Sequence, residues 1–426
     1  MTVLQNISED PCGCDHPTRL KHLISVDDAL ERVFAVKSVS NDPEELQLSS
    51  AVGRILANPV IASARTPPFD NSAMDGYAVN SDVFLGNSPW VLNVVGRAAA
   101  GHDTSVSIAG DDAARIFTGA PLPQGADTII MQEEVQRVGD AIVVSTPPKR
   151  GAHVRRAGED MQAGDVILER GSLIGSREVA ACAAAGCGTV HVARKLRVAI
   201  LVTGDEVRSA GTERSKAGIW DINTPMLQAA LSMPNVDLVE FTHAQDDRAA
   251  LQTQIAALID ETDLLITTGG VSVGDEDHVK PVMNSLRAKV IFSGVAMKPG
   301  KPVTLGRVGQ TYWLGLPGNP LSAFVTWEVF GKTLVEQLSG VSTAKPKRRN
   351  VTLGETIHRK SGRTEFRTAR LAGFDEQGRE VVSFDGATHS GRVATLPRAD
   401  GLIVLPAEFE RLPKGALVEF QPFCES

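Results

Sequence analysis

The segment from about residue 195 to residue 340 alternates short apolar runs with helical patterns, and this limits the folds open to it. Arg197–Thr203 and Asp263–Thr268 have the length and apolar content of buried strands, and Asp247–Leu258 fits a helix. Strands that alternate with helices are joined by right-handed crossovers and form a mainly parallel sheet. We therefore predict an α/β domain at 195–343, which also contains a helix at Pro225–Met233, a strand at Val236–Thr242 and a long helix at Leu321–Leu338.

The chain on both sides of this segment is rich in short β-like runs. Residues 66–155 contain such runs separated by Gly and Pro, which is typical of a small β-rich domain. Residues 344–426 open with a polar linker and continue with further short strands, which indicates a second one. Ser25 is expected to cap an amphipathic helix near the N-terminus. The predicted fold class is α/β plus all-β, with several domains and a flexible tail at 1–20.

The composition argues against several classes of protein. The chain has 426 residues, 42% of them apolar and 22% charged, so we expect about three folded domains rather than disorder. Its 43 Lys and Arg against 51 Asp and Glu argue against a general nucleic-acid-binding protein. Without a secretory signal or an apolar run near the roughly 20 residues that span a bilayer, we expect a soluble, cytoplasmic protein with no membrane partner. Cys12 and Cys14 lie in the tail, where a non-functional segment is favoured over a metal site.

Acidic and glycine residues follow three of the expected strands. They are Glu206 after the first, Asp246 after the second, and the group Gly269, Gly270, Ser272, Gly274, Asp275 and Asp277 after the third. Ligands bind open α/β sheets at the carboxyl ends of strands, and glycines there let backbone N–H groups approach an anion. Carboxylates at the same rim fit a divalent cation held against a ligand phosphate. An ordinary turn whose Asp residues cap a helix explains the Gly-rich segment about equally well.

Two further segments suit an anion. Lys298 and Lys301 lie in the sequence KPGKP, where prolines stiffen the loop that carries both charges. A solvated turn is the alternative. The segment Leu316–Ser322 follows a strand and begins the long helix, with Pro320 in the first turn, so the helix N-terminus offers N–H donors.

The sequence Gly270-x-Ser272-x-Gly274 also matches the nucleophile elbow of α/β-hydrolases. A strand, a turn and a helix are expected around it, as that motif requires. A triad would need a later acid and histidine, and the nominated His358 and His389 both lie in the β-rich C-terminal part. The sequence also contains no HGGG-like oxyanion segment. A nucleophilic Ser272 is therefore the less favoured interpretation.

A set of motifs resembles, in family order, the molybdopterin molybdotransferase family, to which the E domain of gephyrin belongs. The motifs are FDNSAMDGYAV, TGAPLPQGAD, RRAGEDM, TGDEV, TTGGVSVGDED, KPGKP and LPGNPLSAF, and the match runs from about residue 24 to the C-terminus. The resemblance implies an elongated homodimer of four-domain subunits. Its domains would be a linker and dimerisation domain at 21–65 and 156–194, a small β-rich domain at 66–155, a molybdopterin-binding α/β domain at 195–343 and a β-barrel-like domain at 344–426.

The resemblance also implies a reaction, the last step of molybdenum cofactor biosynthesis. Adenylyl-molybdopterin and molybdate yield the cofactor and AMP in the presence of Mg²⁺. The implied partners are a second copy of the chain, a molybdopterin-adenylylating protein and the molybdoenzymes that receive the product. Metal-assisted cleavage of the pyrophosphate needs no protein nucleophile, so Ser272 is better assigned to pterin or phosphate contact.

Site residues follow from positions that match the family motifs, taken together with the rim described above. The catalytic set is Asp75, Asp160, Glu206, Asp246 and Asp277. The metal ligands are Asp275, Asp277, Glu206 and Asp246. The substrate-binding set is Thr118, Gly269, Gly270, Ser272, Gly274, Lys298, Lys301, Pro317, Pro320 and Ser322. Asp75, Thr118 and Asp160 come from a different part of the chain than the α/β domain, and the family explanation is a cleft shared between subunits.

Three positions depart from the family pattern. Gly294 stands where many relatives carry a further lysine, and Ile222 stands where they carry a hydroxyl residue. Thr368 occupies the place of a usual arginine, with Arg367 one residue earlier, and Ser390 and Thr395 lie where relatives place serines. A catalytically weakened paralogue that binds or acts as a scaffold is therefore the second functional hypothesis.

Overall fold

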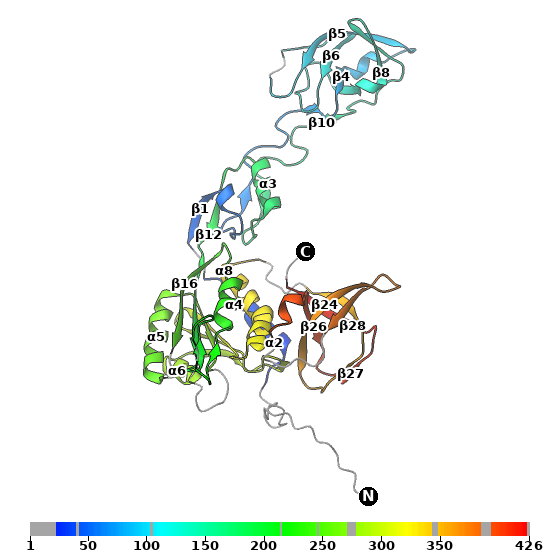
Figure 1. Cartoon of the computed structure of the whole chain (residues 1–426). Coiled ribbons are helices and arrows are strands. Elements are labelled where there is room, and N and C mark those ends of the chain that lie inside the picture. Colours follow the sequence, from blue (N-terminus) through cyan, green and yellow to red (C-terminus); the bar gives the residue numbers. More distant parts are fainter. Residues whose placement is uncertain are drawn as a thin grey trace.

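The computed structural model is elongated and has three parts along its length (Figure 1). A small β domain forms one end, a narrow linker follows, and the α/β and C-terminal β domains lie side by side at the other end (Figure 1). The structure describes residues 23–39, 42–102, 105–213, 215–244, 247–270, 278–342, 348–384 and 393–423. Within these residues, every helix is too short or too polar to cross a membrane.

The α/β domain contains a six-stranded mixed sheet. Its order is β16 (Val236–Ala244), β13 (Leu196–Thr203), β17 (Leu264–Thr268), β21 (Thr311–Leu316), β20 (Thr304–Val308) and β18 (Lys289–Ser293). The first four strands are parallel, whereas β20 and β18 pair antiparallel. Alternate residues of β13 enter two different hydrophobic cores, Val198 and Ile200 one of them and Ala199 and Leu201 the other. Both faces of the strand are therefore covered, which explains its continuous apolar sequence.

The helices of this domain confirm the positions expected from the sequence to within a few residues. They are α4 (Asn223–Ala230), α5 (Arg248–Glu261), α6 (Val279–Ser285), α7 (Pro320–Thr326) and α8 (Lys332–Ser339). A π-helical turn at Trp327–Gly331 interrupts the long helix that we expected at Leu321–Leu338. A Cβ on Gly331 would lie 2.3 Å from Cε3 of Trp327, so glycine is required where the indole packs against this turn. The turn's Glu328 carbonyl accepts a hydrogen bond of 2.8 Å from Gln421 of the C-terminal domain.

The N-terminal helix α2 (Val26–Phe34) begins at the expected cap, because Ser25 Oγ accepts the backbone N–H of Asp28 at 3.0 Å. Its apolar residues, among them Val26 and Leu30, pack into the core of the α/β domain. Helix α2 therefore packs with the α/β domain, although it lies within the segment 21–65 that the sequence assigned to the linker domain.

The linker is built from two distant stretches of chain. β1 (Pro43–Gln47) pairs antiparallel with β12 (Thr189–Ala193), and β2 (Val60–Ile61) pairs with β11 (Val166–Leu168). Helix α3 (Ser176–Ala184) covers their core. The chain thus leaves the linker through the first stretch, forms the small β domain, and returns to the linker through the second stretch.

The small β domain has a six-stranded sheet. Its order is β7 (Thr128–Met131), β4 (Gly76–Val79), β6 (Asp112–Ile116), β5 (Trp90–Ala98), β9 (Ala141–Val144) and β8 (Val135–Val138). The short strands β3 (Asn71–Ser72) and β10 (Val154–Arg155) pair separately from this sheet.

The C-terminal domain closes its sheet into a ring. The order is β24 (Thr364–Phe374), β25 (Glu380–Phe384), β22 (Arg349–Leu353), β28 (Leu417–Pro422) and β26 (Gly401–Leu405), and β26 pairs back onto β24. A short strand of the α/β domain, β19 (Met297–Lys298), adds to β24, and β23 (Ile357–His358) pairs with β27 (Arg411–Leu412). Of these strands, β24 is one that the sequence patterns did not reveal. The first half of the strand, residues 365–369, is buried on both faces, since Phe366 packs into the α/β core and Ala369 into the barrel core.

Candidate functional site

Neighbouring strands of the α/β sheet end at one rim, as the sequence predicted. In register, Thr203 lies opposite Ala244, Val202 opposite Thr268, and Thr268 opposite Leu316. The residues that follow β13, β17 and β21 therefore meet, because parallel strands point their carboxyl ends the same way.

The glycines at this rim allow close backbone approach. A Cβ on Gly269 would lie 3.0 Å from Thr203 Oγ1, and one on Gly318 would lie 3.5 Å from the Cα of Gly269. Gly270 has a φ of 63°, and a Cβ there would lie 2.5 Å from Val279 Cγ2. A side chain at Gly269 would therefore crowd the end of β13, and one at Gly270 would collide with the start of α6.

Glu206 is exposed at the same rim. An added Cβ on Gly204 would come within 2.9 Å of Glu206 Oε2, so the Glu206 carboxylate lies back over the end of β13. His243 Nε2 lies 2.8 Å from the Gly204 carbonyl oxygen and ties β16 to the same turn.

Asn223 is a rim residue that our site prediction missed. It is 6% exposed, and its Nδ2 donates to the Gly318 carbonyl at 2.9 Å and to Thr268 Oγ1 at 3.3 Å. Among the described residues its buried Oδ1 has no hydrogen-bond partner. The Asp-x-Asn spacing from Asp221 was the available clue in the sequence.

Several predicted site residues lie outside the described residues. They are Asp246, Ser272, Gly274, Asp275 and Asp277. Within the described ranges, no group of three His, Cys, Asp or Glu side chains is placed to hold a metal ion. Of the four predicted metal ligands, Glu206 alone falls within those ranges.

The two lysines of the KPGKP loop lie beside the C-terminal barrel. Lys298 is exposed on β19, which pairs with β24 at Glu365, and Lys301 is half-buried. Gly294 has a φ of 84°, and a Cβ there would lie 2.8 Å from Leu23 Cδ2. The local backbone thus disfavours a lysine at this position.

The start of the long helix is more buried than an exposed binding site would be. Pro317 is buried, Pro320 is half-buried, and Ser322 is 5% exposed. These residues line the inner side of the rim after β21 rather than the outer surface.

Asp75 and Thr118, from two separate motifs, meet at one end of the small β domain. Asp75 precedes β4, Thr118 follows β6, and Asp75 Oδ1 accepts both the backbone N–H and the hydroxyl of Thr118 at 2.8 Å. The backbone bond and the hydroxyl bond of Thr118, aided by the charge of Arg115, lower the pKa of the Asp75 carboxyl. The exposed carboxylate is thereby held ionised through one oxygen.

Asp160 and the FDNSAMDG segment lie at the base of the same domain. Asp160 is exposed, and its backbone N–H bonds the Thr66 carbonyl at 3.0 Å. Nearby, Asp70 accepts the Ala157 N–H at 2.8 Å and Arg156 Nη1 at 2.6 Å, which holds the RRAGED turn to the first motif. Sequence patterns alone did not pair these two segments.

The two groups of predicted site residues do not meet within one chain. Asp75 and Thr118 belong to the domain at the far end of the molecule from the α/β sheet that carries the glycine-rich rim (Figure 1).

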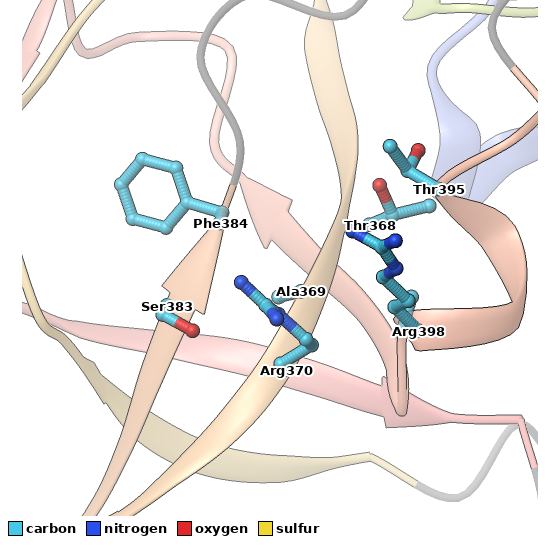
Figure 2. Close-up of a pocket in the computed structure, with 8 residues that line it drawn as sticks. Thr368, Ala369, Arg370, Ser383, Phe384, Thr395 and Arg398 are labelled. Carbon is cyan, nitrogen blue, oxygen red and sulfur yellow. The ribbon is translucent and has the colours of Figure 1, made fainter.

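A small pocket opens in the C-terminal barrel next to β24 (Figure 2). Figure 2 shows the side chain of Arg398 close to Thr368 and Thr395, with Arg370, Ser383 and Phe384 across the pocket. Two guanidinium groups and three hydroxyls make this lining suitable for a small oxyanion.

Arg367, in contrast, is not available to such an anion. It is 6% exposed and donates through Nε to Glu365 Oε1 at 2.8 Å, while Arg359 Nε donates to Glu365 Oε2 at 3.1 Å. The shift of one residue relative to the family pattern therefore turns this arginine into the barrel, where a buried ion pair fixes it.

Comparison with known proteins covers nearly the whole chain. Residues 24–186 match the MoeA N-terminal region (domain I and II), residues 199–337 a probable molybdopterin binding domain, and residues 350–423 the MoeA C-terminal region (domain IV). Molybdopterin molybdenumtransferase of Haemophilus influenzae is 33% identical over 404 residues, 94% of this chain and 99% of that protein. The enzyme of the same name from a Nostoc species is 36% identical over 86% of this chain and 85% of its own length. A crystal structure of the molybdopterin biosynthesis moeA protein of Pyrococcus horikoshii OT3 superposes with a TM-score of 0.80 at 26% identity, covering 94% of this chain and 100% of that one.

Proposed function

The chain belongs to the molybdopterin molybdenumtransferase family, and on that premise we propose that it inserts molybdenum from molybdate into adenylyl-molybdopterin and releases AMP. It is an enzyme of molybdenum cofactor biosynthesis that transfers molybdenum. The observation that carries the finer proposal is the meeting of the β13, β17 and β21 ends, where glycines leave room for a phosphate.

Carboxylates at two places suit the Mg²⁺ that this reaction would use. Glu206 presents an exposed carboxylate over the end of β13, and Asp75 is held ionised through Oδ1. Such oxygen donors fit Mg²⁺, which would neutralise charge on the pyrophosphate. We propose Glu206 with Asp246, Asp275 and Asp277 as its ligands at the α/β rim.

The protein's own groups would bind and orient the rest of the substrate. Gly269, Gly270 and Gly274 let backbone N–H groups approach phosphate, and Ser272 contacts pterin or phosphate. Lys298 and Lys301, with Ser322 and the N–H groups of the helix that begins near Pro320, would hold phosphate or molybdate. Pro317 and Pro320 belong to the substrate-binding set as residues that shape this helix start. Asp75 and Asp160 would act as catalytic residues and Thr118 as a substrate-binding residue, all from the side of the small β domain.

We further propose that the active unit is a cytoplasmic homodimer. Asp75 and the α/β rim lie at opposite ends of one chain, so an active site containing both requires a second copy (Figure 1). In this dimer the segments 21–65 and 156–194 serve as the linker and dimerisation domain. The 66–155 domain of one subunit would then face the 195–343 domain of the other, with 344–426 beside it. A molybdopterin-adenylylating protein would supply the substrate, and molybdoenzymes would receive the product.

The direct test supplies purified protein with adenylyl-molybdopterin, limiting molybdate and Mg²⁺ and follows AMP release. We expect AMP and completed cofactor to appear in equal amounts, in proportion to the molybdate added. Absence of molybdate-dependent AMP release would favour the weakened paralogue. The relatives are molybdenumtransferases, which argues against Ser272 as the nucleophile of a hydrolase.

A further inference from the structure

A row of aromatic and cationic side chains crosses the small β domain next to Asp75. Tyr77 on β4 lies in register with Arg115 on β6, and Arg115 lies in register with Arg97 on β5. Residues directly opposite on neighbouring strands share a face of the sheet. Phe117 joins this row, since its ring centroid is 4.7 Å from the guanidinium carbon of Arg97 and 5.0 Å from that of Arg115.

The two arginines are used differently. Arg115 donates to the Gly76 carbonyl at 3.0 Å, bonds the Gln132 side chain, and also stacks on Tyr77 at 5.1 Å. Because Gln132 N–H in turn bonds the Asp75 carbonyl at 3.1 Å, Arg115 serves to hold the loop that carries Asp75. Arg97 is exposed, and in the part of the chain that the structure describes it forms neither a hydrogen bond nor an ion pair.

Placing two like charges directly opposite each other on neighbouring strands is unfavourable. In the described ranges no carboxylate forms an ion pair with Arg97 or Arg115. The Asp75 carboxylate is instead committed to Thr118, whose backbone N–H and hydroxyl both donate to Oδ1. The Phe117 ring holds the Arg97 guanidinium by a cation–π contact and leaves its N–H groups to solvent.

We propose that Arg97, held on Phe117, binds a phosphoryl group of the nucleotide beside Asp75. A planar guanidinium binds phosphate oxygens with paired, charge-assisted hydrogen bonds. Phe117 immediately precedes Thr118, so this cation lies next to the Asp75–Thr118 pair. The inference rests on the proposed function, because it places the phosphate of AMP, or of the adenylylated substrate, at this end of the β domain.

The test measures AMP and adenosine binding to the full-length protein by calorimetry. Arg97→Gln is expected to weaken AMP binding by about ten- to a hundredfold, since one charge-assisted contact is lost, and to leave adenosine binding unchanged. Arg97→Lys should retain part of the AMP affinity. Arg177→Gln, on exposed α3, makes the same change in net charge far from the row and should bind AMP as the wild-type protein does.

Unchanged AMP affinity in Arg97→Gln, equal losses of AMP and adenosine, or no AMP binding by the wild-type protein would each overturn the inference. Thermal unfolding of each variant shows whether an altered affinity reflects a damaged fold. If the wild-type protein releases AMP from the substrate but Arg97→Gln binds AMP as tightly as the wild-type protein, the Arg97 site is refuted and the proposed function stands. If Arg97→Gln weakens AMP binding but the wild-type protein releases no AMP from the substrate, the proposed function is refuted and the Arg97 site stands.

Discussion

Asp75 and Thr118 are joined by two hydrogen bonds to a single carboxylate oxygen, each 2.8 Å long. Both donors act on Oδ1, so the carboxylate is oriented as well as kept ionised. The two residues lie 43 positions apart in the chain, and the pairing of β4 with β6 brings their motifs together.

Replacing Thr118 with Val should raise the pKa of Asp75 toward its ordinary value. The variant keeps the backbone N–H bond but loses the hydroxyl bond, and both bonds lower the pKa in the native protein. Because a depressed carboxyl pKa keeps the ionised form at low pH, the acid limb of the pH–rate profile should move to higher pH in the variant. Thr253→Val, which removes a helix-surface hydroxyl that bonds the Ala249 carbonyl, should leave the profile unchanged.

Mixed dimers should reveal a shared active site. Asp277→Asn should abolish most AMP release because an amide serves Mg²⁺ poorly, and Asp75→Asn should do so because it removes a carboxylate of the catalytic set. A heterodimer of the two variants contains one cleft with both acids intact, so part of the activity should return on mixing. Verified heterodimers without any recovered activity would show that Asp75 and Asp277 do not act in the same cleft.

Lys298→Ala should raise the molybdate concentration needed for half-maximal rate by roughly ten- to a hundredfold. Excess molybdate should rescue part of the rate, and affinity for adenylyl-molybdopterin should change less. Arg398→Gln, in the barrel pocket of Figure 2, is the matched comparison. A larger molybdate effect in Arg398→Gln than in Lys298→Ala would place the oxyanion in that pocket instead.

Asp263→Asn should destabilise the joint between the linker and the α/β sheet. Burial alone would raise the pKa of Asp263, but hydrogen bonds from Arg194 and Arg197, the shortest at 2.7 Å, hold it below its ordinary value. Breaking a buried pair of this kind costs about 3 kcal/mol, which a urea titration at neutral pH should detect.

The pH dependence of this joint follows from the same shift. A depressed native pKa stabilises the fold above the unfolded-state pKa, and that stability is lost as pH falls through the native value. The difference between wild-type and Asp263→Asn proteins should therefore shrink below about pH 4. Asp375→Asn, which affects a surface ion pair with the exposed Arg379, should have a much smaller effect at every pH.

Local patterns in the sequence were enough to predict the parallel strands of the α/β domain, its main helices and the rim at which those strands end, but they did not predict the antiparallel strands β20 and β18. The apolar run that became β13 and the Ser25 cap of α2 depend on near neighbours in the chain, so their structures follow from spacing and residue type. Of the expected rim, Gly269, Gly270 and Glu206 lie where parallel strands must place them.

Tertiary structure decided the rest, because contacts between distant segments depend on strand pairing that no short pattern encodes. The two buried faces of β24 do not alternate in polarity, since Phe366 packs on one domain and Ala369 on another. The same burial turned Arg367, which lies one residue before the place of the usual arginine, inward to Glu365. Pairing across β4, β6 and β5 likewise aligned Tyr77, Arg115 and Arg97 beside Asp75. Each strand alone shows one of these residues, and only the folded sheet sets them in a row.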